Sequence, residues 1–78
     1  MILVTGGTGF IGRHLVKGLM AADYPVRVLL NEARVKQLDK YFSTPPEVVT
    51  GTVLDDESLF RAVSGAQAII HLENAMWW

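Results

Sequence analysis

The chain has 78 residues, of which 50% are hydrophobic and 19% charged, with a net charge of −1 and no cysteine. This length predicts one small domain, residues 1–78, which buries only a little over ~60% of the surface that its unfolded chain exposes. The weak net charge argues against nucleic acid or an anionic membrane as partner. The lack of cysteine excludes disulfides and thiolate metal sites. Because the sequence shows neither a signal peptide nor a long apolar run, a cytoplasmic protein is predicted.

The chain opens with a strand and a helix. Met1–Thr5 is an apolar run that ends in glycines, which is typical of a strand buried on both faces of a parallel sheet. A helix is predicted over Phe10–Ala22. Its apolar residues at helical spacing, expected on the buried side, are Ile11, Leu15, Leu19 and Ala22.

Two further strands and a helix follow. Val26–Leu30 is predicted as the second strand and Glu32–Phe42 as a weaker second helix that ends before Pro45 and Pro46. The residues of this helix expected to point inward are Val35, Leu38 and Phe42. Glu47–Thr50 is a short third strand.

The last third of the chain predicts one more helix and strand. Asp55 is expected to cap a helix that runs to about Val63, with Gly65 just past its end. Ala66–Leu72 is the fourth strand. Strands that alternate with helices over short connections predict an α/β, Rossmann-like parallel sheet with helices on both faces, built from right-handed crossovers in the order 3-2-1-4.

Four glycines in the stretch TGGTGFIG, residues 5–12, lie between the first strand and the first helix. Gly7, Gly9 and Gly12 satisfy GxGxxG, and Gly6, Gly9 and Gly12 satisfy GxxGxxG, so the sequence leaves the register open. An early glycine permits a tight turn, Gly9 lets the main chain approach a pyrophosphate, and Gly12 allows close packing of the helix.

The N–H groups of Phe10 and Ile11 are expected at the N-terminus of this helix, where free donors and the helix dipole attract an anion. A second phosphate-binding pattern, the P-loop GxxxxGK[ST], nearly fits the same stretch. It fails because Arg13 stands at the lysine position and His14 at the position of the Mg²⁺-binding hydroxyl.

The segment MILVTGGTGFIGRHLV resembles the amino terminus of the extended short-chain dehydrogenase/reductase family, the NAD(P)-dependent epimerases and dehydratases. The segment VVTGTVLDDESLFRAVSGAQAIIHL resembles the same family from its third to its fourth strand. The resemblance covers almost the whole chain but only the first part of the family. It implies a cofactor, NAD or NADP, whose pyrophosphate lies against Gly6, Gly9, Phe10 and Ile11.

The end of the second strand departs from the family pattern. Members that prefer NAD usually carry an aspartate where this chain has Leu30, and members that take NADP often carry an arginine near the position of Asn31. Arg34 and Arg13 are the nearest residues whose guanidinium groups could pair with a 2′-phosphate, and Glu32 is a competing partner for the ribose hydroxyls. The choice stays open, with a slight preference for NADP.

The adenine-binding triplet of the family, G-D-apolar, reads GTV here. The Thr52 hydroxyl can accept a hydrogen bond from the adenine amino group, and the Val53 N–H can donate to the ring. The resemblance places Leu72 beside the cofactor at the end of the fourth strand. The residues after it are Glu73 and Asn74, where the family usually has small residues.

The family's catalytic pair, YxxxK, is absent from this sequence. Tyr24 is followed four residues later by Val28, and Tyr41 by Pro45. The chain by itself is therefore expected to bind a nucleotide without turning over a substrate. Two alternatives stay open: a non-catalytic nucleotide-binding or oligomerisation module, and an interaction domain whose glycine turn binds nothing.

No catalytic or metal-binding role is expected for His14 or His71, which lie far apart in the sequence and lack a third partner. The fourth strand is apolar and would leave one edge unpaired, which favours association of two copies. Self-association through this edge and through Trp77 and Trp78 is predicted.

Overall fold

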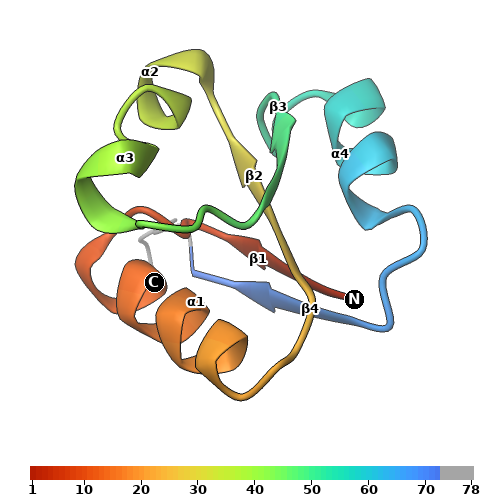
Figure 1. Cartoon of the computed structure of the whole chain (residues 1–78). Coiled ribbons are helices and arrows are strands. Elements are labelled where there is room, and N and C mark those ends of the chain that lie inside the picture. Colours follow the sequence, from red (N-terminus) through yellow and green to blue (C-terminus); the bar gives the residue numbers. More distant parts are fainter. Residues whose placement is uncertain (73–78) are drawn as a thin grey trace, which may run out of the picture.

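The computed structural model describes residues 1–72, which form a four-stranded parallel sheet with helices on both faces (Figure 1). The strand order β3-β2-β1-β4 confirms the predicted 3-2-1-4 arrangement. The strands are β1 (Ile2–Thr5), β2 (Val26–Leu30), β3 (Glu47–Thr50) and β4 (Ala68–His71). The helices are α1 (Phe10–Ala21), α2 (Glu32–Val35), α3 (Leu38–Tyr41) and α4 (Asp56–Val63).

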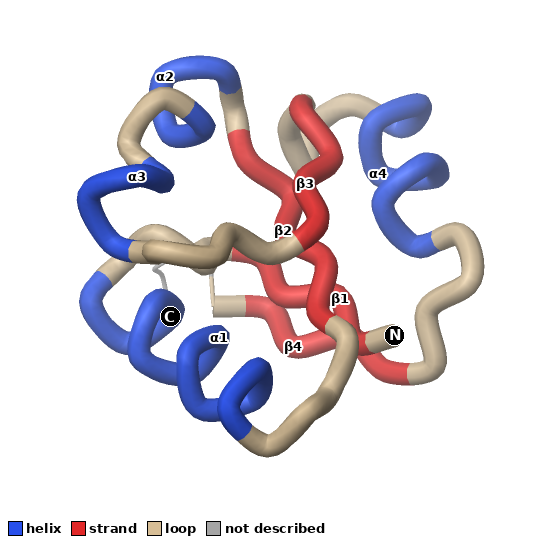
Figure 2. The backbone as a smooth tube through the Cα atoms, in the orientation of Figure 1, coloured by secondary structure: helices blue, strands red, loops and turns tan. Residues whose placement is uncertain are grey.

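The two faces of the sheet carry different helices. From β1 the chain moves through α1, β2, α2 and α3 to β3 at one edge, and then returns past β1 through α4 to β4. Right-handed crossovers in opposite directions place α1, α2 and α3 on one face and α4 on the other (Figure 2). The carboxyl ends of all four parallel strands lie at one edge, with β1 between β2 and β4.

The core has two parts because alternate residues of each strand point to opposite faces. Val4 and Val28 belong to the cluster beneath α1, α2 and α3, together with Val16, Leu38 and other buried residues. The cluster beneath α4 is smaller, and its buried members are Leu3, Leu29 and Ala62.

The buried side of α1 matches the predicted one only in part, with Leu19 packed against the core as predicted. Gly12 and Val16 are buried, whereas Ile11 is 70% exposed and Ala22 is also exposed. The buried face of α1 is thus shifted by about one residue from the face that the hydrophobic pattern predicts. The shift arises because Gly12, which has no side chain, packs against the glycine turn.

The second helix is interrupted, so the prediction of one helix over residues 32–42 is wrong. The N–H groups of Gln37 and Lys40 bond to carbonyls three residues back, at Arg34 and Gln37, instead of four. These tighter turns separate α2 from α3. Leu38 and Phe42 are nevertheless buried in the core, as predicted.

Arg27 of β2 anchors the end of α4. Its Nη1 donates to the carbonyl oxygens of Ala62 at 2.9 Å and Ser64 at 2.7 Å, and its Nε lies 3.1 Å from Glu47 Oε2. A cation at the carboxyl end of a helix also complements the helix dipole. The contact fixes the position of α4 over the sheet.

Asp55 caps α4, as predicted. Its Oδ2 accepts hydrogen bonds from the Ser58 N–H at 2.9 Å and the Ser58 hydroxyl at 2.7 Å. Hydrogen bonds from the Ser58 hydroxyl and the Ser58 N–H lower the pKa of Asp55 against an opposing effect of burial, and the Arg61 charge adds to the lowering. The charged form of Asp55 is therefore the form that the folded chain stabilises.

We expect the Asp55→Asn variant to lose this pH-dependent stabilisation. Because the folded pKa is depressed, the charged cap contributes fully above the ordinary aspartate pKa, about 3.9, and its contribution disappears as the pH falls through the lower folded value. Urea unfolding at neutral pH should show a less stable variant, and the difference from the wild-type chain should shrink below about pH 4. An equal difference at every pH would contradict this assignment.

Candidate functional site

The glycine turn follows β1. Gly6 has φ +74°, a left-handed conformation that favours glycine, and its carbonyl oxygen accepts a hydrogen bond from the Gly9 N–H at 3.2 Å. A Cβ on Gly12 would lie only 2.0 Å from that same oxygen. Gly7 instead faces β2, where a Cβ would lie 2.9 Å from Val28 Cγ1. The geometry thus selects the GxxGxxG register, in which Gly6 makes the turn and Gly12 packs against it.

The first turn of α1 offers free donors. The first backbone bond of this helix runs from the Arg13 N–H to the Gly9 carbonyl, at 2.9 Å. Within residues 1–72 the N–H groups of Phe10 and Ile11 have no hydrogen-bond acceptor, and the side chains of both residues are exposed. Free N–H groups at the start of a 12-residue helix meet the first requirement of an anion-binding site.

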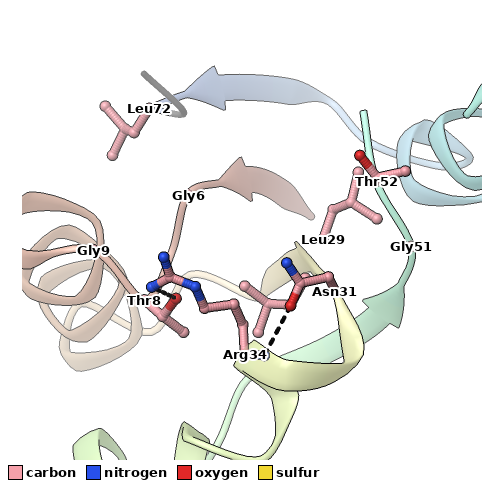
Figure 3. Close-up of a pocket in the computed structure, with 10 residues that line it drawn as sticks. Gly6, Thr8, Gly9, Leu29, Asn31, Arg34, Gly51, Thr52 and Leu72 are labelled. Carbon is pink, nitrogen blue, oxygen red and sulfur yellow. Dashed lines mark hydrogen bonds between the residues drawn. The ribbon is translucent and has the colours of Figure 1, made fainter. Parts of the chain in front are cut away.

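A pocket of about 370 Å³ opens beside this turn, across the carboxyl ends of β1, β2 and β3 (Figure 3). Six of the ten predicted cofactor residues line it, and the other four lining residues come from the glycine turn and from the ends of β2 and β3. The lining residues are Gly6, Thr8, Gly9, Leu29, Leu30, Asn31, Arg34, Gly51, Thr52 and Leu72.

Arg34 and Asn31 form the polar wall of the pocket. The Arg34 side chain extends from α2 toward the glycine turn, where Nη1 lies 3.4 Å from Thr8 Oγ1 (Figure 3). Asn31 caps α2 by accepting a hydrogen bond from the Arg34 N–H at 2.9 Å through its side-chain oxygen. The side-chain NH₂ group of Asn31 remains as a donor, and the Arg34 guanidinium supplies a fixed positive charge.

The opposite wall comes from the loop after β3. The Thr52 hydroxyl accepts a hydrogen bond from the Leu54 N–H at 3.2 Å and keeps a second lone pair for a ligand. A Cβ on Gly51 would lie 2.1 Å from Ser58 Oγ, so glycine allows this loop to pack against α4. Leu72 adds apolar surface, whereas the Leu29 side chain is buried in the cluster beneath α4.

Four predicted cofactor residues are not among the residues that line the pocket. Phe10 and Ile11 begin α1 directly after Gly9, which lines the pocket, and Gly12 is buried behind the turn. Val53 faces the α4 side of the sheet and packs against the cluster of Leu3 and Leu29.

The alternative charged candidates lie elsewhere. The Arg13 guanidinium stacks on the Tyr41 ring, 4.5 Å from its centroid, and in the described chain neither Arg13 nor Glu32 lines the pocket. Sequence reasoning did not single out Thr8 or Leu29. The position of Thr8 inside the glycine motif is the one signal that could have indicated a role at the site.

The two histidines remain apart. His71 pairs with Thr5 in the β1–β4 register, and its Nδ1 hydrogen-bonds to the Thr5 hydroxyl. His14 packs edge-on against the Phe10 ring. Across residues 1–72 there is no group of three or more His, Cys, Asp or Glu side chains placed to hold a metal ion, and no helix there has the length and apolar character needed to span a bilayer.

A parallel sheet whose first strand leads through a glycine turn into a helix, with a pocket across the strand ends, defines a Rossmann-type fold. A solved short-chain dehydrogenase/reductase superfamily protein from Agrobacterium tumefaciens, with bound NAD, has the same fold, at a TM-score of 0.76 and 34% identity over 100% of this chain and 21% of its own. The NmrA-like family model matches residues 1–76, and the chain belongs to the NmrA-like family. These matches confirm the resemblance to the dehydrogenase/reductase superfamily that the sequence indicated.

The curated relatives include a protein named as a reductase and one named as a reductase homolog. A ceramide reductase of Caulobacter vibrioides is 36% identical over 72 residues, which cover 92% of this chain and 22% of the relative. An isoflavone reductase homolog of Zea mays, IRL, is 31% identical over 81 residues, which cover 96% of this chain and 26% of the relative. The chain thus spans about a fifth to a quarter of the length of these relatives.

Proposed function

We propose that the chain binds a nicotinamide dinucleotide with its pyrophosphate on the N–H groups of Phe10 and Ile11. The observation that carries this proposal is the pair of free donors at the start of α1, beside a turn that Gly6 and Gly9 keep clear of side chains. The NAD-bound neighbour of the same fold supports it. When bound, such a cofactor supplies or accepts a hydride.

The size and polarity of the pocket fit the adenosine half of the cofactor. Its volume of about 370 Å³ lies near the lower end of the range for small-molecule sites, ~300–1,000 Å³. In this assignment Asn31 donates to a ribose hydroxyl and Thr52 accepts from the adenine amino group, while Leu72 supplies apolar contact. We assign Val53 no side-chain contact with the cofactor, since its side chain packs on the other face of the sheet.

Calorimetric titration of the 78-residue chain with NAD, NADP and ADP tests the proposal. Saturable binding of all three at one site is expected, because the shared diphosphate makes the main contact. Failure of all three ligands to bind a folded chain would overturn it and would leave the alternative of a domain whose glycine turn is purely structural.

Arg34 is the basis for a proposed choice between NAD and NADP. The Arg34 guanidinium lies in the same wall of the pocket as Asn31. A carboxylate at the position of Leu30 would favour NAD, but Leu30 is a buried apolar residue. A positive charge at this place favours the 2′-phosphate of NADP, and there is no carboxylate among the residues that line the described pocket to repel it. We therefore propose a preference for NADP.

We expect Arg34→Met to weaken NADP binding by ~10–100-fold and to leave NAD binding nearly unchanged. The estimate corresponds to the loss of one charge-assisted hydrogen bond, about 1.5–3 kcal/mol. Lys36→Met removes the same charge two residues away, at an exposed position outside the pocket lining. If that control weakens NADP binding as much as Arg34→Met does, the effect comes from net charge and not from a specific contact.

We further propose that the protein acts in reductase chemistry, as the names of its relatives indicate, and that these 78 residues alone do not turn over a substrate. The sequence contains no YxxxK pair to supply the proton. Saturable oxidation of NADPH by the purified chain with any carbonyl substrate would refute the second statement. A non-catalytic nucleotide-binding module is the alternative.

Three predictions accompany this function: a single domain over residues 1–78, a cytoplasmic location, and self-association. Trp77, Trp78, Glu73 and Asn74 lie outside the described residues. The described part of the chain offers β4 as a sheet edge with uncharged side chains except for the titratable His71. Such an edge supports the prediction of self-association.

A further inference from the structure

Thr8 places a hydroxyl group in the lining of the pocket beside the glycine turn. The residue is only 5% exposed, and its Oγ1 accepts a hydrogen bond from Arg34 Nη1 at 3.4 Å (Figure 3). Among residues 1–72 this is the one hydrogen bond of the Thr8 hydroxyl and also the one hydrogen bond of the Arg34 guanidinium. The glycine turn and α2, which are 26 positions apart in the chain, meet at this contact.

The turn holds the Thr8 side chain in place. The neighbouring Gly7 packs so closely on β2 that a Cβ there would lie 2.9 Å from Val28 Cγ1, and threonine is branched at Cβ, which limits its rotamers. The Thr8 hydroxyl is therefore a fixed point, whereas the Arg34 side chain is long and exposed. Asn31 caps the Arg34 N–H and Thr8 contacts the guanidinium, so both ends of the arginine are held.

The partner of the guanidinium is neutral. Within the part of the chain that the structure describes, Arg34 forms no ion pair with a carboxylate, so the hydroxyl orients its positive charge without neutralising it. The 3.4 Å contact is also longer than the usual ~3.2 Å limit for an N–H···O bond, so it orients the cation without holding it tightly. The other N–H donors of the guanidinium stay available to an anion.

We propose that Thr8 is a positioning residue for NADP, which acts by ordering the Arg34 guanidinium before the 2′-phosphate binds. This inference rests on the proposed function, in which Arg34 binds that phosphate, and adds the residue that holds Arg34 ready. An arginine side chain that moves freely loses much of its rotamer freedom when it binds an anion. An arginine that is already oriented loses less, and the difference appears as a higher affinity for the phosphate.

Calorimetric titration of Thr8→Val and Thr8→Ser with NADP and NAD tests the proposal. Valine resembles threonine in shape but lacks the hydroxyl, so this variant should lower the ratio of NADP to NAD affinity by ~3–10-fold. Serine keeps the hydroxyl and should retain most of the wild-type ratio. Thr8→Ala, which adds no atom that could clash, is a second variant without the hydroxyl and should lower the ratio as valine does. Circular dichroism checks that each variant is folded.

A double-mutant cycle separates positioning from a direct contact of Thr8 with the cofactor. Because Thr8 acts through Arg34, Thr8→Val should cost little further NADP affinity in an Arg34→Met background. Equal losses of NADP affinity in the two backgrounds would overturn the proposal. So would equal losses for NAD and NADP, which a disturbed glycine turn would cause.

The wild-type titration distinguishes failure of this inference from failure of the proposed function. A wild-type chain that binds NAD and NADP equally well would overturn the role of Thr8 and leave dinucleotide binding intact. A folded chain that binds neither would overturn the proposed function and this inference with it.

Discussion

Replacement of Gly12 by alanine is expected to destabilise the chain by about 3 kcal/mol or more, at the upper end of the usual cost of overpacking. The added Cβ would lie 2.0 Å from the Gly6 carbonyl oxygen and 2.9 Å from the Gly6 carbonyl carbon. Both atoms belong to backbone, so neither can move aside by changing rotamer. Either α1 shifts away from the sheet, which opens the core around Val16, or the glycine turn is distorted.

The matched control is Gly18→Ala in the same helix. A Cβ on Gly18 meets no other atom within 4 Å, and alanine is the better helix former by about 1 kcal/mol. Urea unfolding should therefore show that Gly18→Ala raises the stability of the chain and that Gly12→Ala lowers it severely. The expected loss is a large share of the ~4–12 kcal/mol typical of a chain of this length. Similar small effects at both positions would contradict the close contact between α1 and the turn.

Gly9→Ala is expected to weaken nucleotide binding strongly while the fold remains intact. Gly9 has φ −68° and ψ 169°, a conformation open to any residue, and its Cβ would meet only the Gly6 oxygen at an ordinary 3.5 Å. The methyl group would instead lie at the exposed surface beside the free N–H groups of Phe10 and Ile11. A diphosphate must approach that backbone closely, so we expect a loss of affinity of about 100-fold for NAD and NADP alike.

Calorimetric titration and thermal unfolding of the same Gly9→Ala sample separate the two effects. The unfolding midpoint should stay close to that of the wild-type chain, because alanine causes no clash within residues 1–72. Unchanged affinity in a folded variant would show that the diphosphate does not rest on this turn. Arg34→Met then distinguishes the cofactors, since it should affect NADP alone.

Much of the fold could be predicted from the sequence because the relevant signals are local. Apolar runs, glycines and helix caps determine the order of elements, and the right-handed crossover rule converts that order into the 3-2-1-4 sheet. The Asp55 cap depends on residues three positions apart and was predicted correctly. The interruption between α2 and α3 was not predicted, since it depends on how Leu38 and Phe42 reach the core.

The candidate site, like the fold, could be predicted from the sequence only in part. The glycine spacing and the helix that follows it indicate a phosphate-binding turn without any coordinates. The choice between Arg13 and Arg34 required the structure, because Arg13 stacks on Tyr41 and Arg34 extends to Thr8. These contacts join residues 26 or more positions apart, and a local pattern carries no information about them.

By itself the sequence of this protein determines which segments become strands and helices, because periodicity and backbone preference are properties of neighbouring residues. Tertiary structure alone decided the rotation of α1 about Gly12, the register of the glycine motif and the contact of Arg34 with Thr8. Each of these depends on how closely two segments that are far apart in the sequence pack together. Close packing is set by the shapes of both segments.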